Sequence, residues 1–145
     1  MARQTKLETD AFRDGDHLAP MSIGPLLEDH SLRIARVARD FNPRYLVTEE
    51  AERVGESRVP LHPLWILTLA CAALERQARG ARVRSVRLQH LSHAFLKENL
   101  TFKGIVEETM TGSRAVGNTI SVSFHVAAEI GRIIARGRAE LTSDD

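Results

Sequence analysis

Four polar side chains near two prolines can move or hold protons. Asp40 and Asn42 stand in one short stretch, Tyr45 follows shortly after, and His62 directly precedes Pro63. A carboxylate and an imidazole exchange protons near neutral pH, and each can act as a general acid or base. A tyrosine hydroxyl, whose ordinary pKa is about 10, is a poor base there. These residue types suit a reaction that removes one proton and supplies another.

Each of these side chains also has a structural interpretation. Asp40 can bind backbone amides at a helix end, and Asn42, which stands before a proline, is a common turn residue. Tyr45 can be a packed aromatic residue with a hydrogen-bonded hydroxyl. His62 can cap the helix that follows it as readily as it can face a pocket. The residues alone leave both interpretations open.

Other reactive residue types are less informative. His90 and His93 lie near the end of an expected strand, where a surface or interface role is favoured. They predict no metal site, because no cysteine or paired carboxylate completes a ligand set. Cys71 has no evident activating neighbour, so it is not expected to be a nucleophile. Trp65 is expected to line the core or a pocket.

The central element is a predicted helix from Pro63 to Gln77. It carries no charge between His62 and Glu75, and apolar residues fall on every face. This pattern predicts a helix that is buried all round. Its charge-free part is too short to span a bilayer, which needs about 20 apolar residues. A proline suits the first turn, and Gly80 suits the end.

The sequence after Gly80 changes period. Residues 83–90, 100–106, 116–126 and 133–141 alternate between apolar and polar, which predicts strands. Consecutive strands with short connections indicate an antiparallel meander. The expected fold is therefore α+β, with a curved antiparallel sheet of about five strands wrapped around the central helix.

The residues before the central helix form smaller elements. Residues 18–27 contain two prolines and a glycine, so they can form only a short or edge strand. Asp29 is expected to cap a helix that ends before Pro43. A second short helix is expected from Thr48 to Gly55. The apolar side of the first helix is predicted to consist of Leu32, Ala35, Val37 and Ala38.

Composition limits the class of protein. The chain has 145 residues, a formal net charge of +1 and 43% hydrophobic residues, which predicts a single globular domain over 1–145. Residues 1–14 are polar and expected to be flexible. They contain no apolar signal-peptide core, and the single cysteine allows no internal disulfide, so a cytoplasmic location is expected. No membrane contact is expected.

A set of short motifs gives the chain a family resemblance. The motifs are Gly15-Asp16, Ile23-Gly24-Pro25, Asp40-Phe41-Asn42-Pro43-Arg44-Tyr45, Glu50-Ala51, Gly55 and His62. In these motifs the chain resembles the MaoC-like hydratase and dehydratase family, from about Gly15 to Leu141.

The resemblance implies a hot-dog fold and a reaction. Members of the family add water to 2-enoyl thioesters, or remove it from 3-hydroxyacyl thioesters, on coenzyme A or acyl carrier protein. The implied partners are the thioester and a second hot-dog subunit, in a homodimer or a heterodimer, and no further cofactor is implied. The implied catalytic residues are Asp40, Tyr45 and His62. The implied substrate-binding residues are Asn42, Leu64 and Trp65.

Three positions depart from the family pattern. Tyr45 stands where the family has its catalytic histidine, Pro63 replaces a glycine whose amide helps bind the thioester oxygen, and Arg39 replaces the glycine before the aspartate. A proline has no N–H to donate. Tyr45 can serve as the acid, with the amides of Leu64 or Trp65 as replacement donors. Alternatively, the chain is a non-catalytic subunit that binds thioesters or pairs with a catalytic partner, or an enzyme of another thioester chemistry such as hydrolysis or conjugate addition.

A run of arginines follows the central helix. A solvated surface is the plain interpretation, while the phosphates of coenzyme A or an acidic carrier protein also suit it. Nucleic acid is not expected, because aromatic residues do not alternate with the basic ones. The arginines are Arg76, Arg79, Arg82, Arg84 and Arg87.

Overall fold

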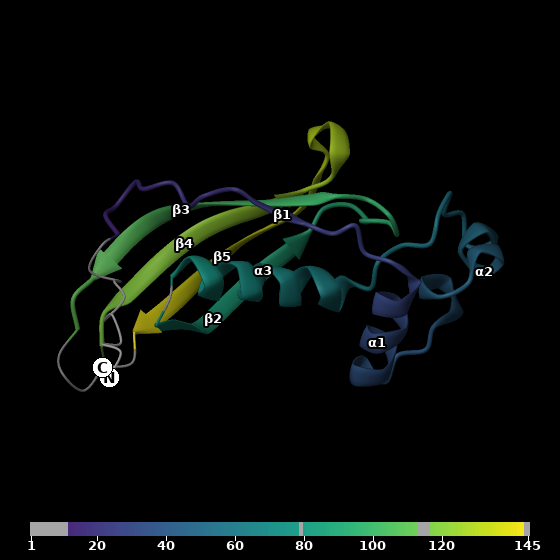
Figure 1. The fold of residues 1–145 in the computed structure, drawn as a ribbon, viewed down its shortest axis with the longest axis horizontal. Helices are drawn as coiled ribbons and strands as arrows, with labels where there is room; N and C mark the ends of the chain where they lie inside the picture. The colour runs from purple at the N-terminus through teal and green to yellow at the C-terminus, as the bar shows by residue number, and fades with distance from the viewer. Residues whose placement is uncertain (1–11, 79, 113–116, 144–145) are drawn as a thin grey trace, which may run out of the picture.

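The computed structural model describes residues 12–78, 80–112 and 117–143 (Figure 1). Residues 1–11 of the expected flexible segment, Arg79 and Val116 lie outside these ranges. The elements are β1 (Met21–Ile23), α1 (Glu28–Ala38), η2 (Pro43–Tyr45), α2 (Thr48–Arg53), α3 (Pro63–Gln77), β2 (Ala81–His90), β3 (Leu100–Met110), β4 (Thr119–Ala127), η3 (Glu129–Gly131) and β5 (Ile133–Ser143).

The five strands form one antiparallel sheet in the order β1-β3-β4-β5-β2. The predicted meander is correct for β3 to β5 and wrong for β2, which pairs with β5 and not with β3. The connection 91–99 is long enough to cross the end of the sheet, and its first amides, from Leu91 and Ser92, donate to the carbonyl of Ile134. The predicted short edge strand before α1 is confirmed as β1, which pairs with β3.

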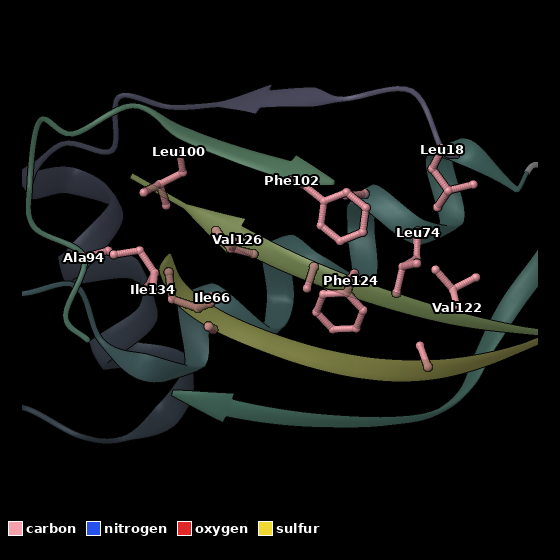
Figure 2. Close-up of a cluster of buried hydrophobic side chains, with 14 of the residues drawn as sticks. Leu18, Ile66, Leu74, Ala94, Leu100, Phe102, Val122, Phe124, Val126 and Ile134 are labelled. Atoms are coloured by element: carbon pink, nitrogen blue, oxygen red, sulfur yellow. The ribbon is translucent and has the colours of Figure 1, made fainter. Parts of the chain in front are cut away.

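The predicted bounds of the central helix, Pro63 to Gln77, are those of α3. It lies along the curved sheet, while α1 and α2 lie beyond one end of the sheet (Figure 1). The buried side of α3 is formed by Ile66, Ala70, Ala73 and Leu74. Figure 2 shows side chains from α3 and from the strands filling the space between them, including Phe102 and Phe124, whose rings stack 5.4 Å apart.

The expectation that α3 is buried all round is wrong for the single chain. Thr68, Ala72, Glu75 and Arg76 are exposed. The sheet covers only one side of the helix, and the other side has no layer of comparable size among the described residues. The lack of charge in this helix therefore does not reflect burial on every face within one chain.

The short elements before α3 confirm the sequence pattern in part. α2 begins at Thr48 and the chain turns at Gly55, as predicted. The predicted cap Asp29 is wrong: α1 is capped at Leu27, whose N–H donates to His30 Nδ1 at 3.0 Å. The buried side of α1 is also different, because the helix turns Ser31, Ile34 and Ala35 inward and leaves Leu32 and Val37 exposed.

The start of the described chain contacts the sheet. Phe12 packs against the core, and Asp14 Oδ1 accepts hydrogen bonds from the N–H and the hydroxyl of Thr109, at 2.8 and 3.0 Å. None of the helices in the described ranges is long and apolar enough to cross a membrane.

Candidate active site

The turn after α1 fixes the position of Asp40. Arg39 adopts a left-handed conformation with φ 53°, a region in which glycine is favoured. The N–H of Asp40 then donates to the carbonyl of Ala35 at 3.0 Å. The N–H of Asn42 donates to Asp40 Oδ1 at 3.1 Å, and Asn42 Oδ1 accepts from the N–H of Arg44 at 3.2 Å. One carboxylate oxygen of Asp40 is thus held by its own turn, and the other is left for a partner.

That partner is His62. Its Nε2 lies 2.8 Å from Asp40 Oδ2, and its Nδ1 accepts the N–H of Leu64 at 3.1 Å. Because Nδ1 accepts, the ring proton lies on Nε2, and the neutral imidazole donates to the carboxylate. The hydrogen bond from His62, with that from the Asn42 amide, lowers the pKa of Asp40. The pair therefore consists of an ionised Asp40 hydrogen-bonded to Nε2 of His62.

Tyr45 completes the group. Its ring packs against the His62 ring with the centroids 4.9 Å apart and the planes at 56°. The Arg44 guanidinium lies over the Tyr45 ring at 5.1 Å. The tyrosine hydroxyl makes no hydrogen bond with a side chain or backbone group of the described residues. The structure brings Asp40, Tyr45 and His62 together, and their catalytic roles remain predictions.

The first amides of α3 already have acceptors. Pro63 has no N–H, the N–H of Leu64 donates to His62 Nδ1, and that of Trp65 donates to the His62 carbonyl at 2.9 Å. The predicted role of Leu64 or Trp65 as donors to a thioester oxygen therefore requires one of these bonds to open. The Trp65 indole N–H is also used, because it donates to the His30 carbonyl at 3.0 Å.

A second charged group lies beside Tyr45 and was missed by the sequence analysis. His93 Nε2 is 3.2 Å from Glu56 Oε1, and Arg44 Nη2 is 3.6 Å from the same oxygen. His93 is thus a half-exposed partner of Glu56 beside the candidate site. No sequence signal connects Glu56 with His93, since they come from different loops.

A third group holds the loop 91–99 against the rest of the molecule. The Glu98 carboxylate is buried and accepts two hydrogen bonds from Arg132 Nη2, at 2.7 and 2.8 Å, and one from Arg58 Nη2 at 2.5 Å. Both guanidiniums lie over the Phe95 ring, at 4.9 and 5.4 Å. The same loop provides the Ala94 carbonyl that accepts the N–H of Leu61 at 2.7 Å. The loop therefore fixes the residue directly before His62.

The remaining candidates lie apart from this chemistry. Burial, with the charge of Glu75, raises the pKa of Cys71, which disfavours a thiolate nucleophile. Burial, with the nearby His93, lowers the pKa of His90. No group of three or more metal-ligating side chains is found in the described part of the chain.

Comparison with known proteins gives a structural likeness. No family model matches this sequence, and no curated protein does. The (R)-hydratase from A. caviae involved in PHA biosynthesis superposes with a TM-score of 0.82 at 17% identity, over 93% of this chain and 99% of its own. A MaoC-like dehydratase from Rhodospirillum rubrum gives 0.73 at 13% identity, over 93% and 94%. The HadBC complex of Mycobacterium tuberculosis, a 3R-hydroxyacyl-ACP dehydratase, gives 0.73 at 12%, over 90% and 96%.

At these low sequence identities, the structural likeness establishes the fold alone. It agrees with the antiparallel sheet and the long helix packed on it, and it confirms the predicted α+β class. The chain has the hot-dog fold that solved (R)-hydratases and MaoC-like dehydratases share.

Proposed function

We propose that this protein is a hydratase or dehydratase acting on 2-enoyl or 3-hydroxyacyl thioesters of coenzyme A or acyl carrier protein. The observation that carries the proposal is the Asp40–His62 pair at the start of α3, with Tyr45 packed on it. The fold supports it, because solved structures with this fold include an (R)-hydratase and a 3R-hydroxyacyl-ACP dehydratase.

In the proposed hydration Asp40 acts as the base and Tyr45 as the acid. Asp40, ionised and oriented by His62 Nε2–H, takes a proton from water as the water oxygen bonds to C3 of the enoyl group. The C2–C3 π electrons move toward the thioester carbonyl, and the resulting enolate takes a proton at C2 from the Tyr45 hydroxyl. Asp40 then passes the proton that it took from water to the Tyr45 phenolate. Both side chains are thereby restored, and the net change is the addition of one water. Dehydration is the reverse.

One observation favours a second candidate function. An enolate-like oxygen needs preorganised donors, yet the Leu64 and Trp65 amides both donate to His62. In the second candidate the protein binds acyl thioesters without turnover, or pairs with a catalytic hot-dog subunit.

The discriminating experiment measures loss of the conjugated enoyl thioester, by absorbance, for 2-enoyl-coenzyme A substrates of varied chain length. The wild type should turn over, and Asp40→Asn should lose at least about 100-fold in kcat while still binding the thioester, because the amide cannot take a proton. Asp29→Asn is the matched control, since it removes an exposed carboxylate from α1. Binding without turnover by the wild type selects the second candidate.

We also propose that the protein works as a dimer, with itself or with a related hot-dog subunit. Among the described strands β2 pairs only with β5, which leaves one edge of Ala81–His90 open. An open edge of this length is a site for pairing with another chain. The exposed side of α3, with Thr68 and Ala72, is a further surface a partner can cover. Light scattering at micromolar concentration tests the assembly. If the protein is a monomer both by itself and when mixed with related hot-dog subunits, the dimer proposal is excluded.

A further inference from the structure

A groove crosses the face of the sheet that points away from α3. Its volume is about 1070 Å³, close to the upper limit of the size range of small-molecule sites. Its floor is one row of residues in register across four strands, in which Gly104 pairs with Phe124, Phe124 with Gly137, and Gly137 with Leu88. The Phe124 side chain points into the core (Figure 2), so the neighbours of this row point outward.

The outward rows on both sides of this floor are cationic. One row contains Lys103, His125, Arg136 and Gln89, and the other contains Ile105, Ser123, Arg138 and Arg87. The four cations of these rows are exposed, and they are Arg87, Lys103, Arg136 and Arg138. No aspartate or glutamate lines the groove. Within the described ranges, no ion pair is found for Arg87, Lys103 or Arg138.

Two of these cations face each other directly. Arg87 and Arg138 are partners in the β2–β5 register. Like charges directly opposite across a sheet are destabilising, and an anion between them would reverse the sign of that contribution. Two guanidiniums suit a phosphate group, because each can donate two parallel hydrogen bonds to it.

The row that contains Arg87 and Arg138 ends in an apolar residue at β3. Ile105 is 39% exposed, and it lines the groove together with Leu18. One row therefore runs from an isoleucine at β3 to two arginines at β5 and β2. A second copy of this chain does not suit the surface, since a two-fold contact would bring the cations of both copies together.

We propose that this groove is a second binding site, separate from Asp40–His62, that takes an amphipathic organic phosphate. The phosphate lies between Arg87 and Arg138, and the apolar part lies over Ile105 at the β3 end of the same row.

The test uses dodecyl phosphate below its micelle concentration, with binding followed by NMR of the backbone amides. The Gly104 and Gly137 signals should shift saturably, while those of Gly15 and Gly55, outside the groove, should not. Arg138→Gln and Arg87→Gln should each weaken binding by about tenfold or more, because each removes charge-assisted hydrogen bonds. The matched control is Arg33→Gln, an exposed cation on α1, which should leave the affinity unchanged.

Several results would overturn the proposal. If neutral dodecyl maltoside binds as tightly as dodecyl phosphate, the cations do not contribute to binding. If inorganic phosphate binds as tightly, the apolar end of the groove does not contribute. The same loss in Arg33→Gln would mean attraction to net charge alone. Displacement of dodecyl phosphate by coenzyme A would make the groove part of the thioester site and not a second one.

Discussion

His62 contacts two groups with its two ring nitrogens, and these contacts fix the orientation of the ring. Nδ1 accepts from the start of α3, while Nε2–H donates to Asp40. The ring is thereby held between the first turn of α3 and the turn that follows α1. The same arrangement keeps Asp40 ionised, since a hydrogen bond to the charged form of a carboxyl lowers its pKa.

The first prediction concerns the pKa of Asp40. His62→Phe should raise it from its lowered value toward the ordinary 3.8, because the largest cause of the lowering is removed. A lowered pKa in the folded state contributes stability above the unfolded value, and that stability is lost as pH falls through the folded one. The wild type should therefore lose this contribution only at pH values below about 4, and the variant should lack most of it. An NMR titration of the Asp40 carboxyl carbon gives the answer, and an unchanged midpoint would contradict the assigned pair.

The second prediction concerns the acid. Tyr45→Phe removes the hydroxyl and keeps the ring that packs on His62. Stability should change by less than about 1 kcal/mol, whereas kcat for enoyl hydration should fall at least about tenfold, if this hydroxyl is the acid. Tyr45→His should restore turnover. Steady-state kinetics with urea unfolding separate the two effects, and full activity in Tyr45→Phe would assign the proton at C2 to another group.

At this scale the sequence predicts which residues meet but not how their atoms are used. Motif spacing indicates Asp40, Tyr45 and His62, and the structure places them together. Motif spacing cannot indicate that the Leu64 N–H donates to His62 Nδ1, because that hydrogen bond depends on the orientation of the His62 ring. It also misses Glu56 beside His93, since the two loops meet only in the folded chain.

At the scale of elements, the local sequence determines where a helix or strand begins and ends, but it does not determine what the element packs against or pairs with. Pro63 and the charges after Leu74 set the limits of α3, so its bounds are predicted correctly. Its open side is not predicted, because a charge-free segment shows what can be buried and not what covers it. The place of β2 beside β5 depends on the path of the loop 91–99, which alternation in the strands does not describe.

The third prediction tests the core. Leu74 is 1% exposed, and Leu74→Ala should lower the free energy of unfolding by about 2–5 kcal/mol, the range for deleting a buried leucine. Leu69 is only partly buried and packs at the edge of the core, so Leu69→Ala should cost less. Thr68→Ala, on the exposed side, should stay within about 0.5 kcal/mol. Urea unfolding measures all three, and a loss below about 1 kcal/mol for Leu74→Ala would mean that α3 is not the centre of the core.

In the whole molecule, the core that stabilises the fold and the candidate site lie in different places. α3 and the inner face of the sheet form the core, whereas the candidate site is built by turns beyond one end of the sheet, near α1 and α2 (Figure 1). Such turns need support from outside themselves, because they bury little apolar surface. The Glu98 group provides it, since it joins Arg58, before α3, to Arg132, before β5, through the loop between β2 and β3.

The fourth prediction follows from this support. Glu98→Gln keeps the size of the side chain but removes its charge, which leaves Arg58 and Arg132 without their buried carboxylate. Because both guanidiniums partly reach solvent, the expected cost is about 1–3 kcal/mol, below that of a fully buried pair.

The effect should also be local. The Leu61 amide, which donates to Ala94 in the supported loop, should exchange with solvent faster in Glu98→Gln, relative to the Phe124 amide in β4, the middle strand of the sheet. Hydrogen exchange resolved by residue measures the ratio. If both amides accelerate equally, Glu98 contributes only to global stability. If the Leu61 amide alone accelerates and the pKa of Asp40 moves toward 3.8, the group fixes His62 against Asp40 through the loop 91–99.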